Sequence, residues 1–562
     1  MVEAEPDRLS KVLRRIAQKK DTWFAMEDAT KLTYLEGVLR HAQSLSFESW
    51  GHETAIQNGH LTETTVGKKQ AGFDMLSTCS IVLTLIKEHI WFYKSHTQIP
   101  KEARPSRNGR HYHLVSPVKL SDQFQPNRTV RAEVWTNDGL DETPKSPGFC
   151  LVLGAGNQPF LSFADMMHQL FVQRHCCILK HHPLRSYCDS YFAHLFQDLI
   201  RDGFVECVEA NLEHTEIIIN HSSITHVHMT GGTSTHDAIV WGEDPNQQEA
   251  NKLSHTPILK KPMTSELGCV TPWLICSGAQ WSEKELWHHA GQLAIAFTHN
   301  DSFNCLAAKV VVIDQDWPQA DDFIKKLRTI LRQIERPASY YPGAQSRYDD
   351  FLRAYPTDSV EIIQSTETPK SIDVPSLPWT LLHIDSTSSD YALQNEAFAP
   401  VLAIYRLHAD NDPEQYLQQA TRLANTHIWG SLSCTVLAHP TIRKNNSQAF
   451  DQCIHQLRYG TIGVNLWTAQ CYAITRTAWG AYPGNRLDNV GSGIGFVNNP
   501  FQLERIEKSV VYAPFVDVNQ ISVNQTGQIP ISYEQSQAIV NLLQKPSIGR
   551  IAKVIWSQMQ QS

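Results

Sequence analysis

The stretch that decides the fold begins with FCLVLGAGNQP (149–159) and continues through FADMMHQLFVQ (163–173), CCILKHH (176–182), SYCDSYFAHLFQDLI (186–200) and THVHMTGGTSTHDAIVWG (225–242). Short apolar runs alternate here with turns and with segments whose apolar residues recur at helical spacing. This alternation is typical of βαβ units, in which helices connect parallel strands. The sequence therefore predicts an α/β fold with a parallel sheet.

The segments on either side extend this pattern. Residues 8–98 have apolar positions at helical spacing, and residues 99–148 alternate in the manner of strands or an extended ribbon. A second α/β series has predicted strands at 273–276, 308–313, 379–383, 401–406, 433–437 and 461–465. Residues 471–500 are rich in Gly, Asn and Pro and predict a long surface loop, in which GSGIG is flexible backbone. A last strand follows near 508–514, and the tail from 524 predicts one amphipathic helix.

Composition excludes several classes of protein. The chain has 562 residues, of which 41% are hydrophobic and 19% charged, as in a folded globular protein. Its net charge of −8 argues against nucleic acid as the principal ligand. The apolar stretch 75–93 is interrupted by charged residues and predicts a buried helix, so no transmembrane segment is expected. The N-terminus has no signal-like apolar core, and the twelve cysteines lack metal-binding spacing. A cytoplasmic protein with reduced thiols and no metal is expected.

A few polar residues stand at the ends of predicted strands. Cys305 stands just before a predicted apolar strand and Glu266 at the beginning of one, where a thiol or a carboxylate can face a cleft. Asn157 follows the first strand, and Gly231 and Gly232 open a helix whose free N–H groups could hold a pyrophosphate. Taken singly, each residue also has an ordinary reading as a buried cysteine, a surface carboxylate or a turn.

Taken in order, these segments resemble the aldehyde dehydrogenase superfamily over about residues 150–515. The resemblance implies a Rossmann-like cofactor domain and an α/β catalytic domain, with a helical N-terminal segment and a small oligomerisation ribbon. It also implies roles for eight residues, which are the nucleophile Cys305, the general base Glu266, the oxyanion-hole residue Asn157, and the cofactor-binding residues Lys180, Gly231, Gly232, Glu396 and Phe398.

The resemblance also assigns the regions of the chain. They are a helical N-terminal part of the cofactor domain (1–110), a ribbon for oligomerisation (111–148), a dinucleotide-binding domain (149–265), a catalytic domain (266–470), a loop with an oligomerisation strand (471–520) and a tail with a helix (521–562).

The chain departs from the family pattern in several places. It has GNQP at 156–159 where the family commonly has Trp-Asn-Phe-Pro, FAP at 398–400 in place of Phe-Gly-Pro, and SFN at 302–304 in place of the usual Gly-Gln pair. Pro183 stands where members that prefer NAD often carry a Glu that excludes a 2′-phosphate. A divergent member that uses NAD or NADP is therefore expected.

The activity implied by the resemblance is oxidation of a small-molecule aldehyde to a carboxylic acid, through a cysteine thiohemiacetal and a thioester, in a homodimer or homotetramer. Two alternatives stay open. One is a CoA-linked acyl reductase or acylating dehydrogenase, in which CoA replaces water. The other is a homologue that binds without turnover.

Overall fold

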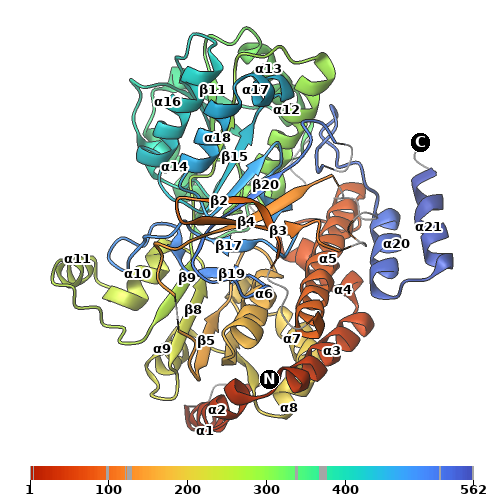
Figure 1. Cartoon of the computed structure of the whole chain (residues 1–562), viewed down its shortest axis with the longest axis vertical. Helices are drawn as coiled ribbons and strands as arrows, with labels where there is room; N and C mark the ends of the chain where they lie inside the picture. The colour runs from red at the N-terminus through yellow and green to blue at the C-terminus, as the bar shows by residue number, and fades with distance from the viewer. Residues whose placement is uncertain are drawn as a thin grey trace.

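The computed structural model describes residues 2–3, 6–95, 100–119, 122, 129–142, 144–335, 339–365, 376–517 and 520–559. Figure 1 shows two α/β halves, one above the other, with the N-terminal helices along one side and helices α20 and α21 beside them.

The lower half contains the stretch that decides the fold. Its sheet has the order β1-β7-β6-β5-β8-β9-β18. These strands are β1 (Val2–Glu3), β5 (Phe149–Leu153), β6 (Cys176–Lys180), β7 (Val205–Glu209), β8 (His226–Thr230), β9 (Met263–Glu266) and β18 (Gly493–Ile494). All neighbours are parallel except β18, which pairs antiparallel with β9. The predicted parallel sheet is confirmed, and its central strands are continuous apolar runs because parallel strands are buried on both faces.

Helices follow the strands of this half in the expected alternation. They are α6 (Leu161–Met167), α7 (Cys188–Leu195), α8 (Gln197–Arg201), α9 (Leu212–Asn220), α10 (Thr233–Trp241) and α11 (Pro245–Leu253).

The upper half is built on a sheet of the order β12-β13-β14-β11-β10-β15-β16-β20-β4-β3-β2. All six predicted strands of the second series are present, as β10 (Pro272–Ile275), β11 (Val310–Asp314), β13 (Thr380–Ile384), β14 (Val401–Leu407), β15 (Ser433–Leu437) and β16 (Thr461–Val464). Together with β20 (Ile506–Tyr512) they run parallel, while β12 (Val360–Ile362) is antiparallel at one edge. Its larger helices are α12 (Glu283–Thr298), α13 (Ala320–Gln333), α14 (Ala344–Arg353), α16 (Pro413–Thr426) and α18 (Ser447–Gln456).

The predicted ribbon is an antiparallel extension of this upper sheet. It consists of β2 (Glu102–Arg107), β3 (Arg110–Ser116) and β4 (Arg131–Asn137), and β4 pairs with β20. The predicted ribbon and last strand are therefore neighbours, although more than 360 residues separate Asn137 from Ile506 in the chain.

The N-terminal region is helical as predicted, with α1 (Pro6–Ala17), α2 (Lys20–Ala25), α3 (Asp28–Ser44), α4 (Phe47–Gln57) and α5 (Thr65–Ser95). Among the described residues, α5 is the one helix long and apolar enough to span a membrane, but 56% of its most apolar window is buried inside the protein. The predicted buried helix is confirmed.

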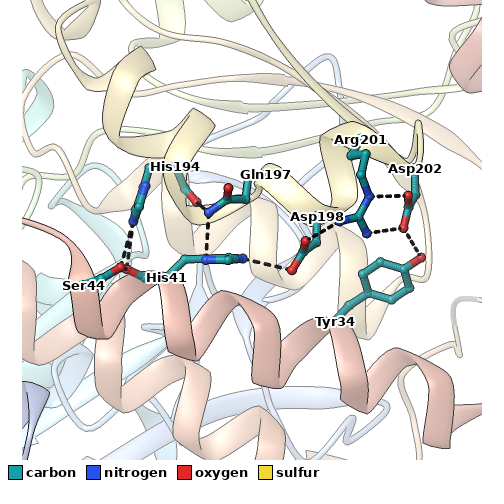
Figure 2. Close-up of polar contacts among 8 residues, drawn as sticks. All are labelled: Tyr34, His41, Ser44, His194, Gln197, Asp198, Arg201 and Asp202. Atoms are coloured by element: carbon teal, nitrogen blue, oxygen red, sulfur yellow. Dashed lines mark hydrogen bonds and ion pairs between the residues drawn. The ribbon is translucent and has the colours of Figure 1, made fainter.

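Polar contacts attach α3 to the lower half, as Figure 2 shows. The Tyr34 hydroxyl donates to the Asp202 carboxylate at 2.8 Å, and the His41 ring lies 2.9 Å from the Asp198 carboxylate. Both acceptors lie at the end of the second βα unit. These two contacts fix α3 against the helices of the lower half.

The region predicted as a long surface loop differs from that prediction. Residues 471–500 contain three short strands, β17 (Ala478–Gly480), β18 and β19 (Phe496–Asn498), and many of their side chains are buried. The tail also holds two helices where one was predicted, α20 (Tyr533–Gln544) and α21 (Ile548–Met559). Gly and Asn at 471–500 supply left-handed turns inside the protein, which composition cannot distinguish from turns in a surface loop.

Candidate active site

Cys305 and Glu266 lie side by side although they come from different halves. Glu266 was predicted to begin a strand, but it ends β9 of the lower sheet, because the apolar run after it is a loop as far as β10. Cys305 lies in the turn before β11 of the upper sheet, as predicted. The Cys305 Sγ is 3.6 Å from the Glu266 Oε1. The two residues predicted as nucleophile and base are thus within the contact distance of a sulfur hydrogen bond.

Glu266 is positioned by the GSGIG segment, which was predicted to be flexible. Gly493 of β18 pairs directly with Glu266, and its φ is +118°. A Cβ at this position would lie 2.0 Å from the Ser265 carbonyl oxygen. Only glycine permits both this backbone conformation and this close approach. The segment is therefore an edge strand that supports the carboxylate, and the prediction of flexible backbone is wrong.

The loop before Cys305 is strained. Asn300, Asp301 and Ser302 are consecutive residues with positive φ, at 54°, 55° and 67°. Each such residue costs about 1 kcal/mol or more, least for Asn and Asp. The Asn300 side chain offsets part of this cost by donating to the carbonyl oxygens of Asn157 at 3.0 Å and Phe303 at 2.9 Å. The loop is therefore held in one conformation that places the thiol.

Lys309 holds the same loop from the following strand. Its Nζ donates to the Ser302 carbonyl oxygen at 2.8 Å and to the Ser302 hydroxyl at 3.1 Å. Burial lowers the pKa of Lys309 to about 8, against the opposing effect of Glu396. The sequence analysis missed this residue, although a single Lys inside the apolar run LAAKVVVID is a signal that could have found it.

Asn157 lies at the expected strand end and is 6% exposed. Its carbonyl oxygen accepts from Arg185 at 2.9 Å as well as from Asn300. Arg185 is completely buried and also donates to Asn58 Oδ1 at 2.7 Å. This network, which was not predicted from the sequence, links the Asn157 turn, the loop before Cys305 and the segment after α4.

Cys305 and Glu266 form part of the wall of an apolar cavity, which is called the tunnel below. The cavity has a volume of about 260 Å³, and most of its lining residues are apolar, among them Phe73, Leu76, Phe160, Leu161, Trp467, Tyr472 and Trp479. Gln158, rather than Asn157, is part of this lining. Among the described lining residues, Glu266 is the sole carboxylate and none is Lys or Arg. The imidazole of His299, which is also part of the lining, is neutral near pH 7 because burial lowers its pKa to about 4.

Burial also sets the protonation of the reactive pair. Desolvation, and then the nearby Asp165 carboxylate, raise the pKa of Glu266 from 4.5 to about 7. Desolvation, Glu266 and Glu396 raise the pKa of the Cys305 thiol well above its usual value. The resting thiol is therefore neutral, and Glu266 can change its protonation near neutral pH.

The residues predicted to bind a cofactor come from several elements of the structure. Gly231 and Gly232 follow β8, and Gly232 precedes α10 with no side chain capping the first N–H groups of that helix. Glu396 approaches the chain after Glu266 so closely that a Cβ on Gly268 would lie 1.9 Å from the Glu396 Oε2. The Glu396 Oε1 is buried and has no hydrogen-bond partner among the residues that the structure describes.

Two further predicted residues have different surroundings. Phe398 has a φ of +38°, and its ring centroid lies 4.9 Å from that of Tyr341 and 5.8 Å from that of Phe303. It therefore belongs to an aromatic cluster beside the catalytic loop. Lys180 ends β6 and is partly buried, and burial lowers its pKa. Strand β5 lies between β6, which ends at Lys180, and β8, which precedes the Gly231 turn.

Comparison with known structures supports the fold. The chain is similar to an NAD-dependent aldehyde dehydrogenase from Sinorhizobium meliloti, with a TM-score of 0.61 and 14% identity over 91% of this chain and 87% of that one. It is similar to the glyceraldehyde-3-phosphate dehydrogenase GapN from Methanocaldococcus jannaschii complexed with NADP, with a TM-score of 0.59 and 12% identity over 92% and 96%. It is also similar to γ-glutamyl-γ-aminobutyraldehyde dehydrogenase from Burkholderia cenocepacia, with a TM-score of 0.60 and 15% identity over 91% of this chain and 89% of that one.

Sequence comparison gives the family directly. No curated protein matches the chain significantly. The sequence model of the aldehyde dehydrogenase family, however, matches residues 127–478, which is more than half of the chain and includes both Glu266 and Cys305. The chain therefore belongs to the aldehyde dehydrogenase family, the oxidoreductases that act on aldehydes.

Proposed function

We propose that the protein oxidises an apolar aldehyde to its carboxylic acid with NAD or NADP, using Cys305 as nucleophile and Glu266 as general base. The observation that carries this proposal is the 3.6 Å contact between the Cys305 Sγ and the Glu266 Oε1 beside the apolar tunnel.

The reaction begins with proton transfer from the thiol. Because burial keeps the Cys305 thiol neutral, a base must remove its proton before sulfur can attack. Glu266 accepts that proton, and the thiolate adds to the carbonyl carbon of the aldehyde to give a thiohemiacetal. Asn157 is the proposed side-chain donor to the oxyanion formed in this addition, together with the backbone N–H of Cys305.

Loss of hydride converts the thiohemiacetal into a thioester on Cys305. The hydride acceptor in this oxidation is a bound nicotinamide dinucleotide. Glu266 then releases its first proton to solvent and takes a second from a water molecule. The resulting hydroxide attacks the thioester carbon, the carbon–sulfur bond breaks to release the acid, and Glu266 returns its proton to the leaving thiolate, which restores both the thiol and the base.

The chain offers suitable groups for the dinucleotide. The uncapped N–H groups that begin α10 after Gly232 suit a pyrophosphate. The buried, unpartnered Glu396 Oε1 suits a ribose hydroxyl donor. Lys180 would contact the adenosine ribose, and Phe398 would pack beside the nicotinamide ribose.

The tunnel lining favours an uncharged, apolar aldehyde. An acidic aldehyde would lose its hydration without meeting a Lys or Arg among the described lining residues. We therefore expect a medium-chain or aromatic aldehyde to be oxidised at least tenfold more efficiently, by kcat/KM, than a short aldehyde that bears a carboxylate. Initial rates with NAD and NADP, with and without CoA, test this expectation. Equal efficiency for the acidic aldehyde would contradict the apolar substrate, and release of an acyl-CoA would favour the acylating alternative.

We expect the rate of acid release to rise with pH through about 7. Below the pKa of Glu266 the carboxyl is protonated and cannot take a proton from water, so the rate falls about tenfold for each further pH unit. The measurement is kcat from about pH 5.5 to 9. Asp165→Asn removes the nearby charge that raises this pKa, so its midpoint should move to lower pH. A rate that is flat across the range would contradict the role of Glu266.

We also expect NADP and NAD to support comparable rates. Pro183 presents no carboxylate to repel the 2′-phosphate, and His182 beside it is neutral because burial lowers its pKa to about 4. Pro183→Glu should shift the preference toward NAD, and Pro183→Gln is the control for losing the proline itself. A wild-type preference for NAD beyond about a hundredfold, or ~2.7 kcal/mol, would contradict this interpretation.

The ribbon supports assembly as a homodimer or homotetramer. Strand β2 lies at the edge of the upper sheet, where its outer backbone groups can pair with another chain. Sedimentation velocity measures this state directly.

A further inference from the structure

Helix α21 carries an apolar face that points away from the protein. Its large apolar residues are exposed, at 87% for Ile548, 47% for Ile551, 52% for Ile555 and 60% for Trp556. At about 100° per residue, these four side chains fall within one arc of about 140°. The arc also includes Ala552, which is exposed as well. A contiguous exposed apolar face of this kind is characteristic of an interaction surface.

The opposite side of α21 is fixed against α20. Arg550 Nη1 donates to the carbonyl oxygens of Asn541 at 2.8 Å and Lys545 at 2.7 Å. The Ser557 carbonyl oxygen accepts from the Gln535 side chain at 3.1 Å. Helix α20 in turn is attached to α5, where Lys87 donates to the Leu543 carbonyl oxygen at 3.3 Å. These contacts fix the rotation of α21, so its apolar face is held outward.

Charge and residue type indicate what covers this face. The sequence of α21, IGRIAKVIWSQM, contains Arg550 and Lys553 and no acidic residue, although the whole chain has a net charge of −8. Lys553 is exposed beside the apolar arc, and Trp556 lies at the edge of the arc nearer Lys553. Arg550 is bonded to α20, so Lys553 is the basic residue beside the face. Isoleucine and tryptophan on one face with a lysine alongside are typical of helices that lie in the surface of a membrane with anionic lipids.

We propose that α21 docks the protein on an anionic membrane surface, with Ile548, Ile551, Ile555 and Trp556 inserted among the lipids and Lys553 at the headgroups. Pairing with a second copy is less favourable. A second copy of α21 offers no acidic residue to Lys553, whereas an anionic lipid headgroup does. This docking is independent of the aldehyde that the site oxidises.

Co-sedimentation of the full-length protein with vesicles tests the proposal. We expect binding to phosphatidylcholine vesicles that contain phosphatidylglycerol, at least tenfold weaker binding to phosphatidylcholine alone, and a decrease on adding salt. The double variant Ile551→Glu and Ile555→Glu should lose at least tenfold in vesicle affinity. Leu212→Glu is the matched control, because Leu212 is an apolar residue of α9 that is 77% exposed, and this variant should bind as the wild type does.

A second variant keeps the test independent of the first. Lys553→Gln changes one exposed charge, so it should fold normally and bind anionic vesicles more weakly without changing aldehyde oxidation in solution. The proposal is overturned if both variants bind vesicles as well as the wild type. It is also overturned if the wild-type protein does not bind the anionic vesicles. If, in addition, the double variant changes the oligomeric state in sedimentation velocity, the face belongs to an interface with a second copy.

Discussion

Cys305→Ala is expected to abolish aldehyde oxidation, with a loss of at least about a thousandfold in kcat. The methyl group cannot form the covalent thiohemiacetal, and no other step in the proposed reaction replaces it. Folding and dinucleotide binding should change little, because the side chain is small and partly exposed and the loop is held by Asn300 and Lys309. The measurements are turnover, followed by absorbance of the reduced cofactor, and cofactor binding by calorimetry.

Cys453→Ala is the matched control for this experiment. Cys453 is a buried free cysteine in α18, and an alanine at this helical position should keep nearly full activity. If Cys305→Ala retained even a tenth of the wild-type turnover, the nucleophile would be wrongly assigned.

Glu266→Gln is expected to lower the steady-state rate by a factor of about 10² to 10⁴. The amide cannot accept a proton, and the imidazole of His299 in the tunnel lining is a weak base with a pKa of about 4. Hydrolysis of the thioester should slow more than hydride transfer, because the thiol can still lose its proton to solvent at higher pH. Rapid mixing should therefore show a burst of reduced cofactor that appears or grows in the variant.

Glu266→Asp separates the charge from its position. This variant keeps a carboxylate but withdraws it by one methylene from the Cys305 Sγ, so it should regain part of the activity and keep a pH-dependent rate. An unchanged steady-state rate in Glu266→Gln would remove Glu266 from the mechanism, and acceleration of product release by CoA would then support the acylating alternative.

The residues of the site were predictable to different degrees. Cys305 and Glu266 each stand at the boundary of an apolar run, so the sequence identifies them as candidates. The family resemblance then assigned them the roles of nucleophile and base. Their contact could not be predicted from the residues alone, because β9 and β11 belong to different sheets. Arg185 and Asn58 carry no motif. Their importance comes from hydrogen bonds that cross three segments of the chain.

The GSGIG segment shows most clearly what local sequence cannot predict. Its glycines predict a turn or flexible backbone in any local reading, since glycine favours both. The structure uses Gly493 for an antiparallel contact with Glu266, and that role depends on a partner more than 220 residues earlier in the chain. The tail gives a similar example, because the orientation of α21 depends on its contacts with α20.

By itself, the sequence determined the α/β class, the main strands of the two α/β series, the helical N-terminal region and the reactive residue types. These follow from hydrophobic period, from run length and from the chemistry of single side chains, all of which are local properties. Only the tertiary structure decided which strand ends meet, how the strained loop before Cys305 is held, and that the tunnel to Glu266 is apolar. These depend on contacts between residues far apart in the chain, and burial at those contacts sets the pKa of Glu266 to about 7.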